Sequence, residues 1–258
     1  MSRSKNAFDH GKAFSAFITG GDPTIEKSEE FILNMVDAGA DLIEIGVPFS
    51  DPIAEGVVIQ DANLRALSNG CTTDDLFELV RRVRTKTDVP IVFLLYCNSV
   101  FKYGYDRFCA KGQEVGLDGL IIPDLPFEEK NELAPIAASY DMDIISLIAP
   151  TSEDRIKKIA ADSTGFVYVV SSMGVTGVRS EIKTDLASML ESIREATDNP
   201  AAIGFGISTP EQAKKMAGIA DGAIVGSAIV KIIAEHGADS TPYIVDYVKS
   251  MKAAVLEA

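Results

Sequence analysis

Eight short runs of apolar and β-branched residues alternate along the chain with longer amphipathic segments. The predicted strands are residues 13–19, 42–47, 90–96, 119–123, 143–148, 165–170, 201–206 and 222–226. Helical periodicity follows several of them, at residues 26–39, 73–87, 152–163 and 209–220. Eight such units in 258 residues are typical of an α/β fold, the eight-fold β/α (TIM) barrel, which we predict as a single domain over residues 1–258. An open doubly wound sheet is the alternative, but no G-x-G-x-x-G pattern follows the first predicted strand.

One predicted helix carries a complete start signal in its sequence. Thr209 provides a capping hydroxyl, Pro210 fits the first helical position, and Gln212 completes a capping box. We therefore expect a helix to begin at residue 210, directly after the seventh predicted strand.

The charge balance narrows the possible partners. Lys and Arg number 24 against 38 Asp and Glu, for a net charge of −14. This surplus of negative charge disfavours nucleic acid and anionic membrane surfaces as partners. A bound phosphate would be held by backbone N–H groups rather than by a basic patch.

The positions of the cysteines and histidines argue against a disulfide framework and against a metal site. Cys71, Cys97 and Cys109 follow neither a disulfide framework nor a zinc spacing, so we expect reduced thiols in a cytoplasmic protein. The two histidines, His10 and His236, lie near opposite ends of the chain, and no metal site is predicted. The N-terminus lacks the apolar core of a signal peptide, and no apolar run approaches the length of a membrane span.

Glycine-rich turns follow the last three predicted strands, at residues 174–177, 204–206 and 226–227. The last turn opens into a helical pattern, so its N–H groups and helix dipole would favour an anion. One such turn alone is ordinary turn chemistry. Three turns at the corner where barrels often bind phosphate favour a backbone-built phosphate site.

Two acids lie in and after the second predicted strand. Alternation places Leu42, Glu44 and Gly46 on one face, and we expect that face to point into the barrel, with Gly46 leaving space for a ligand. A buried carboxyl has a raised pKa and can exchange protons near neutral pH. The alternatives are a Glu44 satisfied by a serine, tyrosine or backbone partner, and a solvated loop acid at Glu55.

Six motifs, in order along nearly the whole chain, give this sequence a family resemblance. They are ITGGDP (18–23), EIGVPFSDPIAEG (44–56), PDLP (123–126), SSMGVTG (171–177), GFGIS (204–208) and VGSAIVK (225–231). The sequence resembles the tryptophan synthase alpha subunit. That resemblance implies a lyase of tryptophan biosynthesis that cleaves indole-3-glycerol phosphate to indole and glyceraldehyde 3-phosphate without a cofactor of its own. It also implies an alpha2beta2 complex with a beta subunit that carries PLP and receives the indole.

The resemblance also assigns roles to residues. Glu44 matches the catalytic acid–base, and Glu55 matches the acid that accepts a hydrogen bond from the indole N–H. The positions that match phosphate binding are Gly177, Gly206, Gly226 and Ser227. The positions that match the indole pocket are Phe17, Leu94, Tyr96, Ile121, Ile148, Tyr168 and Phe205. Asp51 and Thr176 match a pair that meets when the site closes, and residues 50–57 and 98–104 match the docking face for the beta subunit.

The chain departs from the family pattern at one point. The family carries Asp-Gly-Pro where this sequence has Glu55, Gly56 and Val57, so the acid is one methylene longer and a φ-fixing proline is missing. This departure supports an alternative function, a weakly catalytic or non-catalytic barrel that binds the substrate phosphate and activates a beta subunit. A further alternative, another phosphate-binding barrel such as an epimerase or a phosphosugar isomerase, would need histidines or metal ligands at the strand ends, and neither His10 nor His236 is placed there.

Overall fold

The computed structural model describes residues 3–171, 185–204 and 206–258. Eight parallel strands form a closed barrel in which each strand pairs with the next and β8 returns to β1. The strands are β1 (Ala13–Thr19), β2 (Leu42–Gly46), β3 (Ile91–Leu94), β4 (Gly119–Ile121), β5 (Asp143–Ile148), β6 (Val167–Val170), β7 (Ala201–Gly204) and β8 (Gly222–Val225). The predicted barrel is confirmed, and the open doubly wound sheet is wrong.

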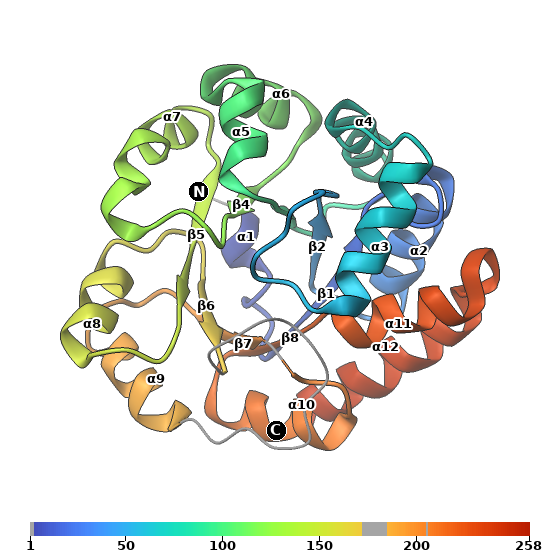
Figure 1. Cartoon of the computed structure of the whole chain (residues 1–258). Coiled ribbons are helices and arrows are strands. Elements are labelled where there is room, and N and C mark those ends of the chain that lie inside the picture. The colour runs from blue at the N-terminus through green and yellow to red at the C-terminus, as the bar shows by residue number, and fades with distance from the viewer. Residues whose placement is uncertain (1–2, 172–184, 205) are drawn as a thin grey trace.

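The helices form a ring around the strands (Figure 1). They are α2 (Ile25–Asp37), α3 (Val57–Ser68), α4 (Thr73–Arg84), α5 (Cys97–Tyr103), α6 (Tyr105–Val115), α7 (Ala134–Ser139), α8 (Glu153–Ala161), α9 (Leu186–Arg194), α10 (Pro210–Ile219), α11 (Ser227–His236) and α12 (Thr241–Leu256). Short 3₁₀ turns occur at η1 (Phe127–Glu132) and η2 (Gly237–Asp239). No helix in the described part of the chain is long and apolar enough to cross a membrane.

The local signals in the sequence agree with the observed elements. β1 and β5 have the predicted bounds, and α10 begins at Pro210 with the predicted capping box between Thr209 and Gln212. β2, β3, β4 and β8 end one or two residues before the predicted run does. Those last residues leave the sheet and begin the loops at the carboxyl ends of the strands, where barrel active sites are built.

Residues that alternate along the strands pack into separate apolar clusters on the two sides of the sheet. The inner cluster fills the barrel and contains Leu42, Val92, Ile121, Ile145, Phe166, Tyr168, Val170, Ala202 and Ile224. The outer cluster joins the sheet to the helices and includes Ile43, Ile45, Phe93, Leu120, Phe31, Leu76 and Phe77. Leu42 therefore faces inward while Ile43 and Ile45 face the helices, as the alternation in β2 predicts.

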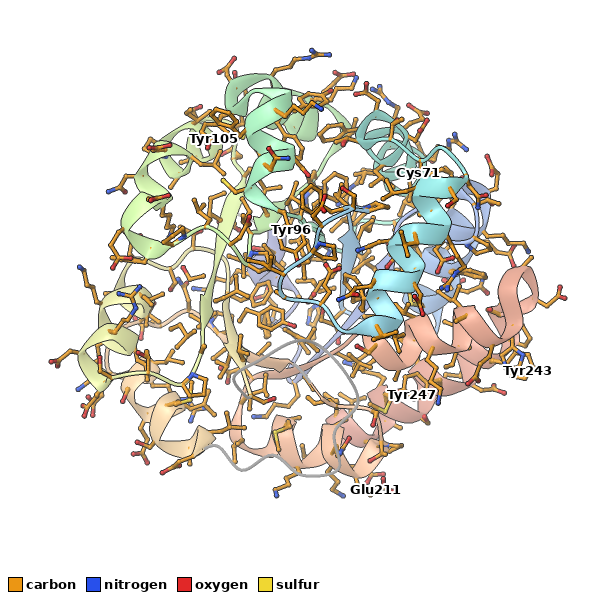
Figure 2. All side chains as sticks on the ribbon, viewed as in Figure 1. Cys71, Tyr96, Tyr105, Glu211, Tyr243 and Tyr247 are labelled. Atoms are coloured by element: carbon orange, nitrogen blue, oxygen red, sulfur yellow. The ribbon has the colours of Figure 1, made fainter. Side chains whose placement is uncertain are left out.

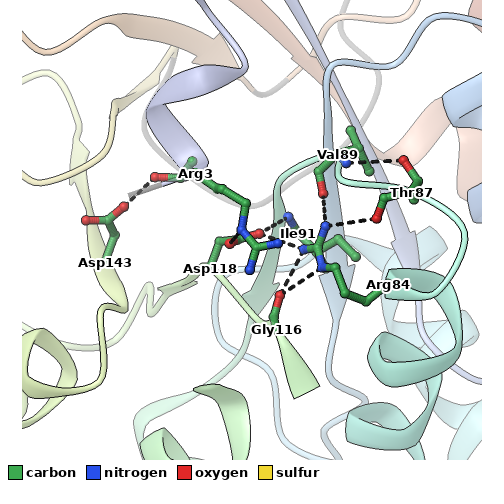
Figure 3. Close-up of polar contacts among 9 residues, drawn as sticks. Arg3, Arg84, Thr87, Val89, Ile91, Gly116, Asp118 and Asp143 are labelled. Carbon is green, nitrogen blue, oxygen red and sulfur yellow. Dashed lines mark hydrogen bonds and ion pairs between the residues drawn. The ribbon is translucent and has the colours of Figure 1, made fainter. Parts of the chain in front are cut away.

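The N-terminal helix α1 (Arg3–Asn6) lies within the ring of helices and closes the end of the barrel where the strands begin (Figure 1). Arg3 and Arg84 both pair with Asp118, each at 2.7 Å (Figure 3). Asp118 also accepts a hydrogen bond from the backbone N–H of Ile91 at 2.8 Å. Ser4 donates a hydrogen bond to Asp143, the first residue of β5. These polar groups occupy the end of the barrel where the strands begin, whereas barrel active sites are built at the other end, where the strands finish.

Candidate active site

Glu44 lies in β2, inside the barrel, with only 1% of its surface exposed. Ser15 of β1 donates a hydrogen bond from Oγ to Glu44 Oε1 at 2.8 Å. Burial raises the pKa of Glu44 to about 7, and the Ser15 hydrogen bond opposes this shift without cancelling it. The serine partner expected for a purely structural glutamate is thus present, yet the carboxyl can still donate and accept a proton near neutral pH.

Glu55 lies near the end of the loop after β2 and is also buried, with 6% of its surface exposed. The Asn63 amide, on α3, donates to Glu55 Oε2 at 2.7 Å. Burial raises the pKa of Glu55 to about 6, while hydrogen bonds from Asn63 and Tyr96 act in the opposite direction. The interpretation of Glu55 as a solvated loop acid is therefore wrong. Its longer side chain is held by two donors from separate elements.

Tyr96 organises the loop that carries Glu55. Its hydroxyl accepts a hydrogen bond from the backbone N–H of Ala54 at 3.0 Å, and its ring stacks on Phe49 with 5.1 Å between centroids. Tyr96 lies near the centre of the barrel mouth, whereas Tyr243 lies at the periphery (Figure 2). Tyr96 therefore contacts the loop after β2 at two places, at Phe49 near its start and at Ala54, the residue before Glu55.

The glycine beside Glu44 does not leave open space. A Cβ placed on Gly46 would lie 2.6 Å from Cζ of Phe17, so the Phe17 ring fills that position. A Cβ on Gly226 would lie 3.1 Å from Cδ1 of the same ring, and a Cβ on Gly204 would lie 2.3 Å from the Tyr168 hydroxyl. The expectation that Gly46 makes room for a ligand is wrong. These glycines make room for aromatic side chains of the site.

We expect Gly46→Ala to destabilise the protein by about 1–3 kcal/mol, because the new methyl group must displace the Phe17 ring. Denaturant unfolding measures the change. Gly218→Ala is the matched control, since a Cβ there meets nothing within 4 Å and alanine is the better helix former in α10. Equal stabilities for the two alanine variants would contradict the packing argument.

The structure brings most of the predicted pocket residues together. Phe17 and Leu94 pack at the mouth of the barrel with Ile59, Ala62 and Val230. Leu94 also contacts the inner cluster, which contains Ile121 and Tyr168. Ile148 is not grouped with them, since it belongs to the outer cluster. Phe205 lies outside the described residues.

The predicted phosphate corner lies at the ends of the paired strands β7 and β8. Gly226 is the N-cap of α11 and Ser227 is its first residue, and the first helical hydrogen bonds run from Ile229 and Val230 to the Gly226 carbonyl. The N–H groups of Ser227 and Ala228 precede these bonds and have no partner within the helix. Gly206 is buried and has φ +80°, a conformation that favours glycine. Asp51 is exposed on the loop after β2. Gly177 and Thr176 lie outside the described residues.

The buried Glu44 makes stability depend on pH. A glutamate with an ordinary pKa near 4.5 ionises freely in the unfolded chain, while the folded protein resists ionisation of Glu44 up to about pH 7. We therefore expect its contribution to the free energy of unfolding to fall by roughly 3 kcal/mol as the pH rises from 4.5 to 7. Glu44→Gln should gain stability over the wild type across this range.

Urea unfolding of both proteins at pH 5 and pH 8 measures this difference. Glu191→Gln, at an exposed position of α9, controls for removal of a carboxylate alone. A stability difference between Glu44→Gln and wild type that is the same at both pH values would contradict the assignment.

Within the described residues, no three His, Cys, Asp or Glu side chains gather in a way that would hold a metal ion. The fold and the two buried carboxyls instead define a class of protein, a β/α barrel equipped for acid–base chemistry at the carboxyl end of its strands.

Comparison with known proteins gives the family. The family model described as tryptophan synthase alpha chain matches residues 4–255. The tryptophan synthase alpha chain of Lacticaseibacillus casei is 48% identical over 255 residues, covering 99% of this chain and 96% of the relative. The chain belongs to the tryptophan synthase alpha chain family, and the resemblance seen in its motifs is confirmed.

Solved structures agree with this assignment. Tryptophan synthase subunit alpha from Legionella pneumophila str. Paris superposes with a TM-score of 0.90 at 32% identity, covering 100% of both chains. A chain of the tryptophan synthase complex from Pyrococcus furiosus superposes with a TM-score of 0.86 at 34% identity, covering 94% of this chain and 99% of that one.

Proposed function

We propose that this chain is the lyase subunit of a tryptophan synthase, which cleaves indole-3-glycerol phosphate to indole and glyceraldehyde 3-phosphate. The observation that carries the proposal is Glu44, a carboxyl enclosed in the barrel with a pKa raised to about 7. The cleavage needs one group that gives a proton to the indole ring and takes one from the glycerol chain. A carboxyl that is partly protonated at neutral pH can do both.

In the proposed cleavage, Glu44 gives a proton in the first step and regains one in the last. Its protonated form gives a proton to C3 of the indole, which leaves positive charge on the ring nitrogen. The bond from C3 to the first glycerol carbon then breaks, and its electrons return to the ring. The hydroxyl on that carbon becomes the aldehyde of glyceraldehyde 3-phosphate, and its proton returns to Glu44. No proton is gained or lost overall.

The two carboxyls are suited to different roles. Glu55 receives hydrogen bonds from Asn63 and Tyr96, whereas Glu44 receives one from Ser15, so hydrogen bonding favours the ionised form more strongly at Glu55. An ionised Glu55 accepts a hydrogen bond from the indole N–H and stabilises the positive nitrogen. Environments that separate the pKa values of two acids in this way assign one to proton transfer and one to charge stabilisation.

Substrate binding is proposed at the residues that match the family. The indole would lie against Phe17, Leu94, Tyr96, Ile121, Tyr168 and Phe205, whereas Ile148 faces the helices and is left out of the pocket. The phosphate would be held by Gly177, Gly206, Gly226 and Ser227, and the first turn of α11 supports this because it directs N–H groups and positive dipole at an anion. Asp51 and Thr176 would meet on closure.

The proposed partner is a PLP-carrying beta subunit in an alpha2beta2 assembly, with no cofactor in this chain. Exposed apolar side chains on the two predicted docking segments support it: Ile53 and Val57 are 73% and 69% exposed, and Phe101 is 68% exposed. Apolar groups gathered on a protein surface are typical of an interface. We place the reaction in the cytoplasm, supported by the free thiols of Cys71, Cys97 and Cys109.

Indole release from indole-3-glycerol phosphate, measured with and without a cognate beta subunit, tests the proposal. We expect turnover by the chain alone and faster turnover in the complex. Tight binding of the substrate phosphate without any indole release, alone or in the complex, would overturn the lyase and favour the regulatory alternative. Nothing in the described structure favours that alternative, since Glu55 is buried and held despite its extra methylene.

A further inference from the structure

Ser15 is a polar side chain inside an otherwise apolar stretch of the barrel wall. It lies in β1 between Phe14 and Ala16, and only 5% of its surface is exposed. Its neighbour in the pairing of β1 with β2 is Leu42, one inward position before Glu44. A hydroxyl buried at such a site is costly unless it makes a hydrogen bond.

The hydroxyl of Ser15 makes that bond with the carboxyl of Glu44, from Oγ to Oε1 at 2.8 Å. A serine hydroxyl can donate to a carboxylate and can also accept from a protonated carboxyl. Ser15 can therefore keep its contact in both protonation states of Glu44. Because Ser15 holds Oε1 of Glu44, the second carboxyl oxygen, Oε2, is the one available to a substrate.

We propose that Ser15 is a positioning residue, which fixes the carboxyl of Glu44 through Oε1 and directs Oε2 to the reacting atoms. The proposal rests on the lyase function proposed above and adds a residue to it. Ser15 touches neither substrate nor reacting atoms in this scheme and acts through Glu44.

The groups around Glu44 determine how far the pKa of its carboxyl depends on Ser15. Tyr168, from β6, is a titratable group whose pKa the charge of Glu44 raises further above its ordinary value, beyond the effect of burial. β3 contributes the non-titrating Val92 beside Glu44. The Ser15 hydrogen bond lowers the pKa of Glu44 against the effect of burial, so its removal should move that pKa upward.

Ser15→Ala and Ser15→Thr, compared with wild type, test the proposal. We expect Ser15→Ala to lower kcat roughly tenfold with KM changed less than about twofold, and to move the pKa of Glu44 upward by roughly half a unit to one unit. Ser15→Thr keeps the hydroxyl, so its kcat and the pKa of its Glu44 should stay close to those of the wild type. Carboxyl ¹³C NMR of glutamate-labelled protein reports the pKa without activity, and Glu44→Gln assigns the signal by its loss.

The control is Ser146→Ala in β5, a strand serine that is also buried but contacts Lys130 at 3.4 Å. It should leave both the pKa of Glu44 and kcat unchanged. An unchanged Ser15→Ala, or a Ser15→Thr that behaves like Ser15→Ala, would overturn the positioning role. A wild type that releases no indole would refute the lyase instead, while the NMR comparison would still decide whether the Ser15 hydroxyl controls Glu44.

Discussion

Glu44→Gln is expected to reduce indole release at least about 100-fold, because an amide cannot exchange the protons that the cleavage requires. The substitution keeps the size of the side chain and an oxygen that accepts the Ser15 hydrogen bond. The proposed phosphate corner at α11 is also untouched. Steady-state kcat for indole-3-glycerol phosphate, with and without a beta subunit, measures the loss.

Binding provides the control for that result. An indole carrying an alkyl phosphate, without the glycerol hydroxyls, cannot be cleaved and should bind Glu44→Gln and wild type within a few-fold of each other. Weak binding together with low kcat would indicate a damaged pocket rather than a missing acid–base group. A variant that retains more than a tenth of the wild-type kcat would remove Glu44 from the proton transfer.

Glu55→Asp is expected to lower kcat by roughly 10- to 100-fold, even though it restores the residue that the family carries at this position. The shorter side chain withdraws the carboxylate from Asn63, which now donates to it at 2.7 Å, and a displacement of about 1 Å at a reacting group costs that much. Asn63 left without its partner would be a buried, unsatisfied amide. Indole release under saturating substrate measures the change.

Glu26→Asp is the matched control, since it shortens an acid in the first turn of α2 whose side chain is 75% exposed. It should leave kcat unchanged. A faster Glu55→Asp would mean that the longer acid impairs the wild-type site. That outcome would restore weight to a barrel that mainly activates its partner.

The fold was predictable because its signals are local. Each strand is a short apolar run, and each inward position follows from alternation along one segment, as for Leu42 and Glu44 in β2. The start of α10 followed from Thr209, Pro210 and Gln212 alone. The inward position of Glu44 could therefore be inferred from the order of residues in a single strand.

The features of the site that the sequence did not predict depend on contacts between segments that are distant along the chain. Asn63 reaches Glu55 only because the loop after β2 folds back on α3, and no local pattern marks that contact. The Phe17 ring covers Gly46 because of the register between β1 and β2, which pairs Phe17 with Glu44 and Thr19 with Gly46. Sequence alternation gives the face of a residue but not its neighbour across the sheet, so the ring could not be foreseen.

The pairing of β1 with β8 has a consequence for synthesis of the protein. Ala13 of β1 lies opposite Gly222 of β8, so more than 200 residues separate the partners of this seam. During translation β1 emerges before β8, so one edge of β1 stays unpaired until β8 has left the ribosome. Unpaired strand edges invite association with other chains. The nascent protein therefore carries an exposed strand edge until β8 arrives, and a chaperone that covers this edge would be useful over that whole interval.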